Sequence, residues 1–164
     1  MTRPAPGTPE ARALWALAER LADTARAAAL PHFRAPGLTA ESKAAAFDPV
    51  TVADRAVEDA IRALLAAERP ADAILGEERA ASAGTSGLTW VIDPIDGTRG
   101  FLAGTPVWGV LIALADRDGP FLGIIDQPHI GERFRGGLGL AQVDGPRGTA
   151  PLATRPPRPL DQAI

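Results

Sequence analysis

The stretch Trp90-Val-Ile-Asp-Pro-Ile-Asp-Gly-Thr-Arg-Gly-Phe101 decides how the fold of this chain is predicted. It begins with an apolar run, Trp90 to Ile92, which is typical of a buried strand. Two acids, Asp93 and Asp96, follow in a segment that also contains proline and glycine. Proline lacks the N–H that a strand ladder needs, and glycine allows a sharp bend. The pattern therefore predicts a strand that ends in an acidic turn.

Two interpretations of the acidic turn stay open on these residues alone. Aspartate, proline and glycine are common turn-forming residues, so the segment from Asp93 to Thr98 could be only a connection. Two carboxylates in one turn, however, repel each other unless a cation lies between them. Hard oxygen ligands of this kind suit Mg²⁺. The second interpretation makes the end of the strand a metal site.

The composition excludes several classes of function. The chain has 164 residues, which is enough for one domain with a core of its own. Its net charge of -3 indicates no basic surface, so we expect no nucleic-acid partner. The absence of cysteine excludes disulfides and thiolate zinc sites. The chain has two histidines, His32 and His129, and no HExxH pattern, which excludes most zinc-hydrolase chemistry.

The N-terminal segment and the hydropathy of the chain indicate where in the cell the protein is expected to be. Residues Met1 to Pro9 lack the basic-then-apolar order of a signal peptide. No apolar run approaches the ~18 residues that a membrane span needs. We therefore expect a cytoplasmic protein with no membrane among its partners.

Two helices are predicted in the first part of the chain. A capping hydroxyl at Thr8, followed by proline and glutamate, opens the first helix, and Pro31 ends it. Thr51 opens the second helix, and Pro70 stops it. The apolar stripe predicted for the second helix consists of Ala53, Val57, Ala60, Ile61 and Leu64.

Strands dominate the remainder of the chain. The segment 32–47 between the helices is expected to be irregular or edge structure. Apolar runs separated by turn residues predict strands at 73–75, 90–92, 107–115 and 121–125, and a further hairpin within 133–152. Helices followed by a run of strands predict an α+β fold, in which the N-terminal helix pair packs on a mostly antiparallel β-sheet.

Three acidic positions are expected to meet. Glu77 follows a short strand and a glycine, as Asp93 follows another strand. Two neighbouring strands that end at the same edge would bring these carboxylates together. Asp54 lies at capping-box spacing from Thr51, so capping is its favoured interpretation on local grounds. Glu78 is expected to be a solvated neighbour.

With these motifs in order, the chain resembles the inositol monophosphatase family of Mg²⁺-dependent, lithium-sensitive phosphatases. The resemblance rests on three segments at family-like separations, which are Asp48–Asp54, Gly76–Glu78 and Trp90–Thr98. Segments 96–113 and 125–134 look most like the bacterial histidinol-phosphatase branch of the family. Gly100 stands where true inositol phosphatases usually have asparagine, which weakens an inositol assignment.

The resemblance implies a role for each site residue. It makes Glu77 and Asp93 ligands of one Mg²⁺, helped by the backbone carbonyl of Ile95. Asp93 and Asp96 would share a second Mg²⁺.

The resemblance also assigns the catalytic and substrate-binding residues. Asp54, Thr98 and Glu77 would be catalytic, with Thr98 and Asp54 orienting the attacking water. Gly97 and Thr98 would contact substrate. Lys43 and Arg99 are further candidates, for added positive charge and for a substrate contact. An ordinary exposed side chain is the alternative for both.

The activity that the resemblance implies is a metal-dependent phosphomonoesterase that acts on a small phosphorylated metabolite. Two or three Mg²⁺ ions are expected, with Mn²⁺ as a substitute, inhibition by Li⁺ and a homodimer as a candidate assembly. L-Histidinol phosphate is the expected substrate, and inositol 1-phosphate or another small phosphate ester is the alternative. An inactive metal-binding fragment is the alternative from another class.

The end of the chain departs from the family pattern. Residues 1–154 are expected to form the metal-binding N-terminal domain, and residues 155–164 a proline-rich linker or tail. Family members continue into a second αβ domain, whose Trp-Asp motif completes the second metal site. This sequence contains no such motif, so we expect an incomplete second site and an exposed apolar surface where that domain would dock. A frayed natural tail is the simpler alternative for the last residues.

Overall fold

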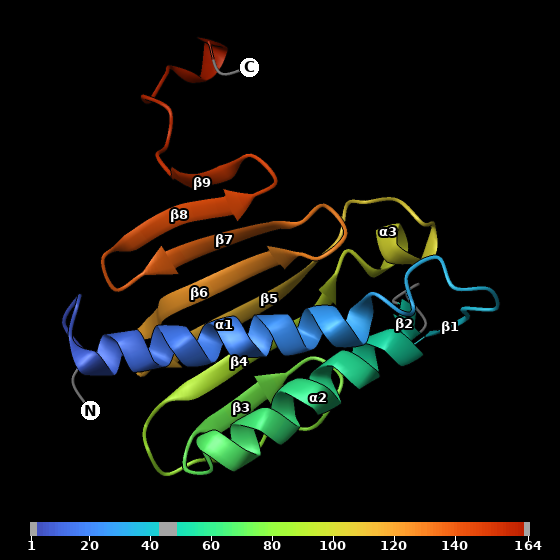
Figure 1. Cartoon of the computed structure of the whole chain (residues 1–164), viewed down its shortest axis with the longest axis horizontal. Helices are drawn as coiled ribbons and strands as arrows, with labels where there is room; N and C mark the ends of the chain where they lie inside the picture. The colour runs from blue at the N-terminus through green and yellow to red at the C-terminus, as the bar shows by residue number, and fades with distance from the viewer. Residues whose placement is uncertain (1–2, 43–48, 163–164) are drawn as a thin grey trace.

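The computed structural model describes residues 3–42 and 49–162. Two helices lie together on one face of a curved sheet (Figure 1). The last strand in the chain forms one edge of this sheet, and the C-terminal segment leaves the sheet there. The elements in chain order are α1 (Pro9–Ala29), β1 (Ala40–Ser42), β2 (Pro49–Thr51), α2 (Val52–Glu68), β3 (Ala73–Gly76), β4 (Thr89–Asp96), α3 (Thr98–Leu102), β5 (Gly109–Asp116), β6 (Gly119–Gln127), β7 (Glu132–Gly137), β8 (Leu140–Gly145), β9 (Gly148–Pro151) and a 3₁₀-helix (Leu160–Gln162).

The main sheet has the order β3-β4-β5-β6-β7-β8-β9. The pair β3 and β4 is parallel, and the other neighbouring pairs are antiparallel. Strands β1 and β2 form a separate antiparallel pair. The predicted α+β class, with a helix pair on a mostly antiparallel sheet, is confirmed.

Both predicted helix starts are present. The Thr8 hydroxyl accepts the backbone N–H of Ala11 at 3.2 Å, and α1 ends at Ala29, just before Pro31. Helix α2 buries Val57, Ile61 and Leu65 against the sheet. The predicted apolar stripe of this helix included Ala60 and Leu64, which are only half-buried, and it left out Leu65, which is buried. The reason is that the residue one helical turn after Ile61 on the core face is Leu65.

The predicted end of the fourth strand is wrong. Strand β4 continues to Asp96 instead of ending after Ile92, before Pro94. Its register with β5 shifts between Asp93 and Asp96. A bulge accommodates a residue that has no N–H for the ladder, so proline does not end the strand. Asp93 and Asp96 therefore lie on a strand, and the sharp turn comes at Gly97.

Two further strand predictions need correction. Strand β5 begins at Gly109, and Val107 before it is 68% exposed. The region predicted as one hairpin, 133–152, contains the three strands β7, β8 and β9. Leu138 and Gly139 have φ values of 48° and 80°, and this left-handed pair makes the extra turn.

The core lies between the helices and the sheet. Trp90, near the start of β4, is fully buried, and its indole N–H donates to Asp72 at 3.0 Å. The other large apolar side chains that are fully buried in the described residues are Phe101, Leu21, Ile61, Leu65, Ile95, Ile112, Leu114, Leu122 and Ile124.

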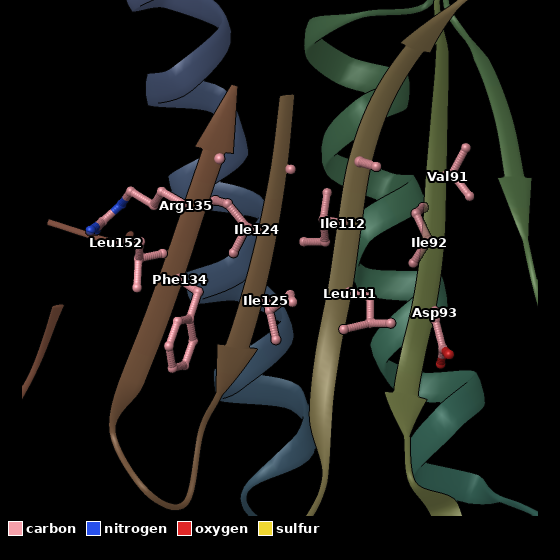
Figure 2. A pocket seen from close by; sticks show the side chains of 13 residues that line it. Val91, Ile92, Asp93, Leu111, Ile112, Ile124, Ile125, Phe134, Arg135 and Leu152 are labelled. Carbon is pink, nitrogen blue, oxygen red and sulfur yellow. The ribbon is translucent and has the colours of Figure 1, made fainter. Parts of the chain in front are cut away.

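The other face of the sheet is apolar, and within residues 3–42 and 49–162 no helix lies over it (Figure 1). Figure 2 shows a groove on this face, with a volume of about 540 Å³, that is lined by side chains of β4, β5, β6 and β7. Val91 is 36% exposed and Ile125 is 50% exposed. The expected exposed apolar surface is therefore present. Asp93 lies at its margin (Figure 2).

The chain leaves the sheet after β9. Residues 152–159 form no strand or helix and are exposed. Within residues 3–42 and 49–162, no helix has the length and apolarity that a membrane crossing requires.

Candidate functional site

The pairing of β3 with β4 brings two of the predicted carboxylates together. Gly76, the last residue of β3, lies opposite Ile92 in this parallel pair, so the next residues, Glu77 after β3 and Asp93 within β4, follow at the same end of the pair. The pKa of Asp93 is raised to about 7, by burial first and then by the charge and hydrogen bond of Glu77. The charges of Asp96 and Asp54 raise it further. Three carboxylates, those of Glu77, Asp96 and Asp54, therefore act on Asp93 at this end of the sheet.

Asp93 has a carboxylate oxygen that is unpaired in the described part of the chain. Its Oδ1 is buried and has no hydrogen-bond partner among the described residues. A buried carboxylate oxygen without a donor, close to other negative charges, is unfavourable unless a cation compensates it. These residues thus have the donor type and charge that a divalent cation requires.

The side chains as placed do not form a complete ligand shell. Within residues 3–42 and 49–162, no group of three or more His, Cys, Asp or Glu side chains is arranged so that it could hold a metal ion. The acidic residues are thus gathered at one end of the sheet without being closed around a common point.

Asp54 has the capping role that its spacing predicts. Its carboxylate accepts the backbone N–H of Thr51 at 2.8 Å and the Thr51 hydroxyl at 2.6 Å. The Thr51 hydroxyl in turn accepts the N–H of Ala53 at 3.0 Å, which completes the capping box of α2. Asp54 is 2% exposed, and its charge reaches Asp93. The same carboxylate therefore caps a helix and contributes to the acidic group.

Thr98 begins the short helix α3, directly after the turn. Its hydroxyl donates to the backbone carbonyl of Ile95 at 3.0 Å. This bond links two residues that the family resemblance placed at the site. The pairing of Thr98 with Asp54 in orienting a water stays a prediction.

Gly97 makes the turn between β4 and α3. Its φ is 85°, in the left-handed region, and a Cβ built on it would lie 2.8 Å from the carbonyl oxygen of Val107. Glycine is thus required here for two reasons, conformation and space.

Alanine at Gly97 and at Gly87 should separate these two reasons. Gly87 has a similar φ of 82°, and nothing lies within 4 Å of a Cβ built there. We expect Gly87→Ala to lower the free energy of unfolding by about 1 kcal/mol, through left-handed strain alone. Gly97→Ala should lower it by about 1–2 kcal/mol more, because the methyl group overpacks against Val107. Urea unfolding measures both; equal losses would contradict the close approach.

The remaining predicted residues have different surroundings. Asp96 and Arg99 are exposed, and the side chain of Ile95 is buried. Glu78 was expected to be a solvated neighbour, but it is half-buried, and its backbone N–H is bound by a buried acid. Lys43 lies outside the residues that the structure describes, as does Asp48 of the first motif.

That buried acid, Glu58, was missed by sequence reasoning. It is fully buried on α2, next to Val57 on the face that packs on the sheet. The available signals were a charged residue beside the apolar stripe and an arginine, Arg62, four residues later, since a buried charge needs a specific partner.

Comparisons with known proteins identify the family of the chain. A family model described as the inositol monophosphatase family matches residues 10–164. The chain is 42% identical to the histidinol-phosphatase of Mycobacterium tuberculosis over 134 residues, which are 80% of this chain and 51% of that protein. It is 44% identical to the histidinol-phosphatase of Streptomyces coelicolor over 122 residues, which are 72% of this chain and 45% of that protein.

A solved structure supports the fold. The extragenic suppressor protein SuhB from Bartonella henselae superimposes with a TM-score of 0.76 and 28% identity, over 87% of this chain and 55% of that one. The chain thus spans about half the length of the curated relatives and of the solved structure that it matches.

Proposed function

We propose that this chain, which belongs to the inositol monophosphatase family, carries the metal-binding part of a phosphomonoesterase that hydrolyses L-histidinol phosphate. The observation that carries the proposal is the convergence of Glu77, Asp93 and Asp96, with a buried Asp93 oxygen that has no donor in the described structure. Identity to two histidinol-phosphatases supports the choice of substrate.

The proposed metal is Mg²⁺, with Mn²⁺ as a substitute. Glu77, Asp93 and the carbonyl of Ile95 would hold one ion, and Asp93 and Asp96 would contribute to a second. When bound, such ions polarise a phosphoryl oxygen and lower the pKa of a bound water.

The other residues would orient the reactants. Asp54 and Thr98 would position the attacking water, with Asp54 itself fixed by its two bonds from Thr51. Gly97 and Thr98, at the start of α3, would contact the phosphate, and Arg99 is a proposed contact for the rest of the substrate. Most of this work is positioning, which contributes to catalysis by holding reacting groups in line.

A second candidate function is metal binding without turnover. One observation favours it, which is that the chain spans about half the length of its relatives. In this case the acidic group would bind a divalent cation but lack the further residues that hydrolysis needs.

Phosphate release separates these candidates. We expect the chain to release phosphate from L-histidinol phosphate in the presence of Mg²⁺, with much less release from inositol 1-phosphate and none without metal. An Asp93→Asn variant should be inactive, because it lacks the proposed shared ligand. Faster release from inositol 1-phosphate would overturn the substrate assignment. Mg²⁺ binding by calorimetry without release from either ester would support the second candidate.

A further inference from the structure

Glu58 is a buried carboxylate that contacts the loop after β3. It lies on α2 with no exposed surface. Its Oε2 accepts the backbone N–H of Glu78 at 2.7 Å, and its Oε1 accepts the backbone N–H of Arg79 at 3.2 Å. A side chain from the helix layer therefore binds the main chain immediately after Glu77.

The residue before Glu77, which is Gly76, also packs closely against the Glu58 carboxylate. A Cβ built on Gly76 would lie 2.0 Å from Oε1 of Glu58 and 2.4 Å from its Cδ. No side chain can occupy that space, so glycine lets β3 pass directly over the carboxylate. Glu77 is thus held between a residue that packs on Glu58 and a residue whose N–H is bound by it.

Arg62 completes this arrangement. It lies one turn after Glu58 on α2, and its Nε donates to Oε1 of Glu58 at 2.7 Å. Its other nitrogens donate to the Ser82 hydroxyl at 3.0 Å and to the Ala80 carbonyl at 3.1 Å. Arg62 therefore compensates the buried charge and closes the far end of the same loop.

We propose that Glu58 is a positioning residue, which holds the loop 76–79 so that Glu77 lies beside Asp93. The inference rests on the proposed function in that Glu77 and Asp93 are taken as metal ligands. The hydrogen bonds to Glu78 and Arg79 and the packing under Gly76 fix the main chain on both sides of Glu77. Groups that orient a ligand from outside the metal shell affect metal affinity through that orientation.

The first test is Glu58→Gln, which preserves the size of the side chain. The two carboxylate oxygens accept three N–H donors, from Arg62, Glu78 and Arg79. An amide offers one oxygen and one NH₂, so at least one donor is left facing another donor. We expect Mg²⁺ affinity to fall by about 10–100-fold in calorimetry. We also expect the Glu78 and Arg79 amides to exchange faster with solvent by NMR.

Asp59→Asn is the matched control. Asp59 is the next residue on α2, it pairs with the Arg79 guanidinium at 2.6 Å, and the change removes the same charge. It leaves the backbone bonds to Glu58 in place, so metal affinity should change less than about twofold. An equal loss in both variants would show an effect of charge alone and would overturn the proposal.

A double-mutant cycle tests the same contact without relying on one variant. Gly76→Ala should weaken Mg²⁺ binding in the natural chain, because its methyl group displaces Glu58. In a Glu58→Ala background the methyl group has room, so the same change should have less than about a twofold effect. Losses that simply multiply would overturn the proposal.

Amide exchange at Glu78 and Arg79 distinguishes failure of the positioning role of Glu58 from failure of the proposed metal-binding function. If the natural chain binds no Mg²⁺, the proposed function fails, and exchange at Glu78 and Arg79 still decides whether Glu58 holds the loop. If both amides stay protected in Glu58→Gln while Mg²⁺ binds normally, the positioning role fails and the proposed function stands.

Discussion

Replacing Asp93 with asparagine should abolish tight Mg²⁺ binding and at the same time stabilise the metal-free chain. Asp93 is the residue at which the acidic group converges, because burial, Glu77, Asp96 and Asp54 all raise its pKa. Removing a group that only orients a metal ligand lowers metal affinity by about 10–100-fold. Removing a ligand itself should cost more, so we expect Asp93→Asn to lower Mg²⁺ affinity by more than about 100-fold.

The metal-free chain should respond in the opposite direction. At pH 8 the Asp93 carboxylate is charged, partly buried and close to other acids, and its Oδ1 has no donor in the described structure. Asparagine removes that charge in nearly the same volume. We expect the free energy of unfolding in EDTA to rise by about 1 kcal/mol, a figure kept small because water partly screens the site.

Calorimetry with Mg²⁺ and urea unfolding in EDTA measure the two effects. Asp118→Asn is the control, since Asp118 lies in the exposed turn between β5 and β6, where its side chain is 68% exposed. It should change neither quantity. If Asp93→Asn destabilised the metal-free chain, the carboxylate would have a structural partner that the geometry does not show, and the metal assignment would weaken.

Local signals explain which features of this fold could be predicted. The capping hydroxyls of Thr8 and Thr51 act within three residues of themselves, so they are readable from the sequence. The meeting of Glu77 and Asp93 was also predictable, because each follows a short apolar run. It required only that the two strands be neighbours with the same direction, as β3 and β4 are.

Features that depend on pairing between distant segments could not be predicted in this way. Pro94 reads as a strand terminator, but the register shift against β5 lets β4 continue past it. Glu58 reads as a surface residue of a helix. Arg62, one turn later, is a local partner that the sequence offers. The other partners of Glu58 are backbone N–H groups 20 and 21 residues away, which carry no sequence signal. Residue type alone does not reveal which main-chain donor a buried acid will meet.

The attachment of α1 to the sheet gives the largest expected loss of stability. Asp126, on β6, has no exposed surface. Its carboxylate accepts hydrogen bonds from the guanidinium groups of Arg26 on α1, at 2.7 Å, and of Arg133 on β7, at 2.8 Å. Arg133 also donates to Glu19 at 2.7 Å and to Asp23 at 2.8 Å, both on α1. The network therefore joins the helix layer to two adjacent strands.

Asp126→Ala should lower the free energy of unfolding by about 3–5 kcal/mol, because it leaves two guanidinium groups beside an empty buried position. The Arg133 side chain is only 9% exposed, so water cannot replace the lost carboxylate. Urea unfolding with an unchanged m-value measures the loss. Asp59→Ala is the control, because it removes a carboxylate from an exposed pair with Arg79 and should cost less than about 1 kcal/mol. A loss below about 1.5 kcal/mol for Asp126→Ala would mean that Glu19 and Asp23 alone satisfy Arg133. In that case the apolar contacts of α1, and not this network, would hold the helix on the sheet.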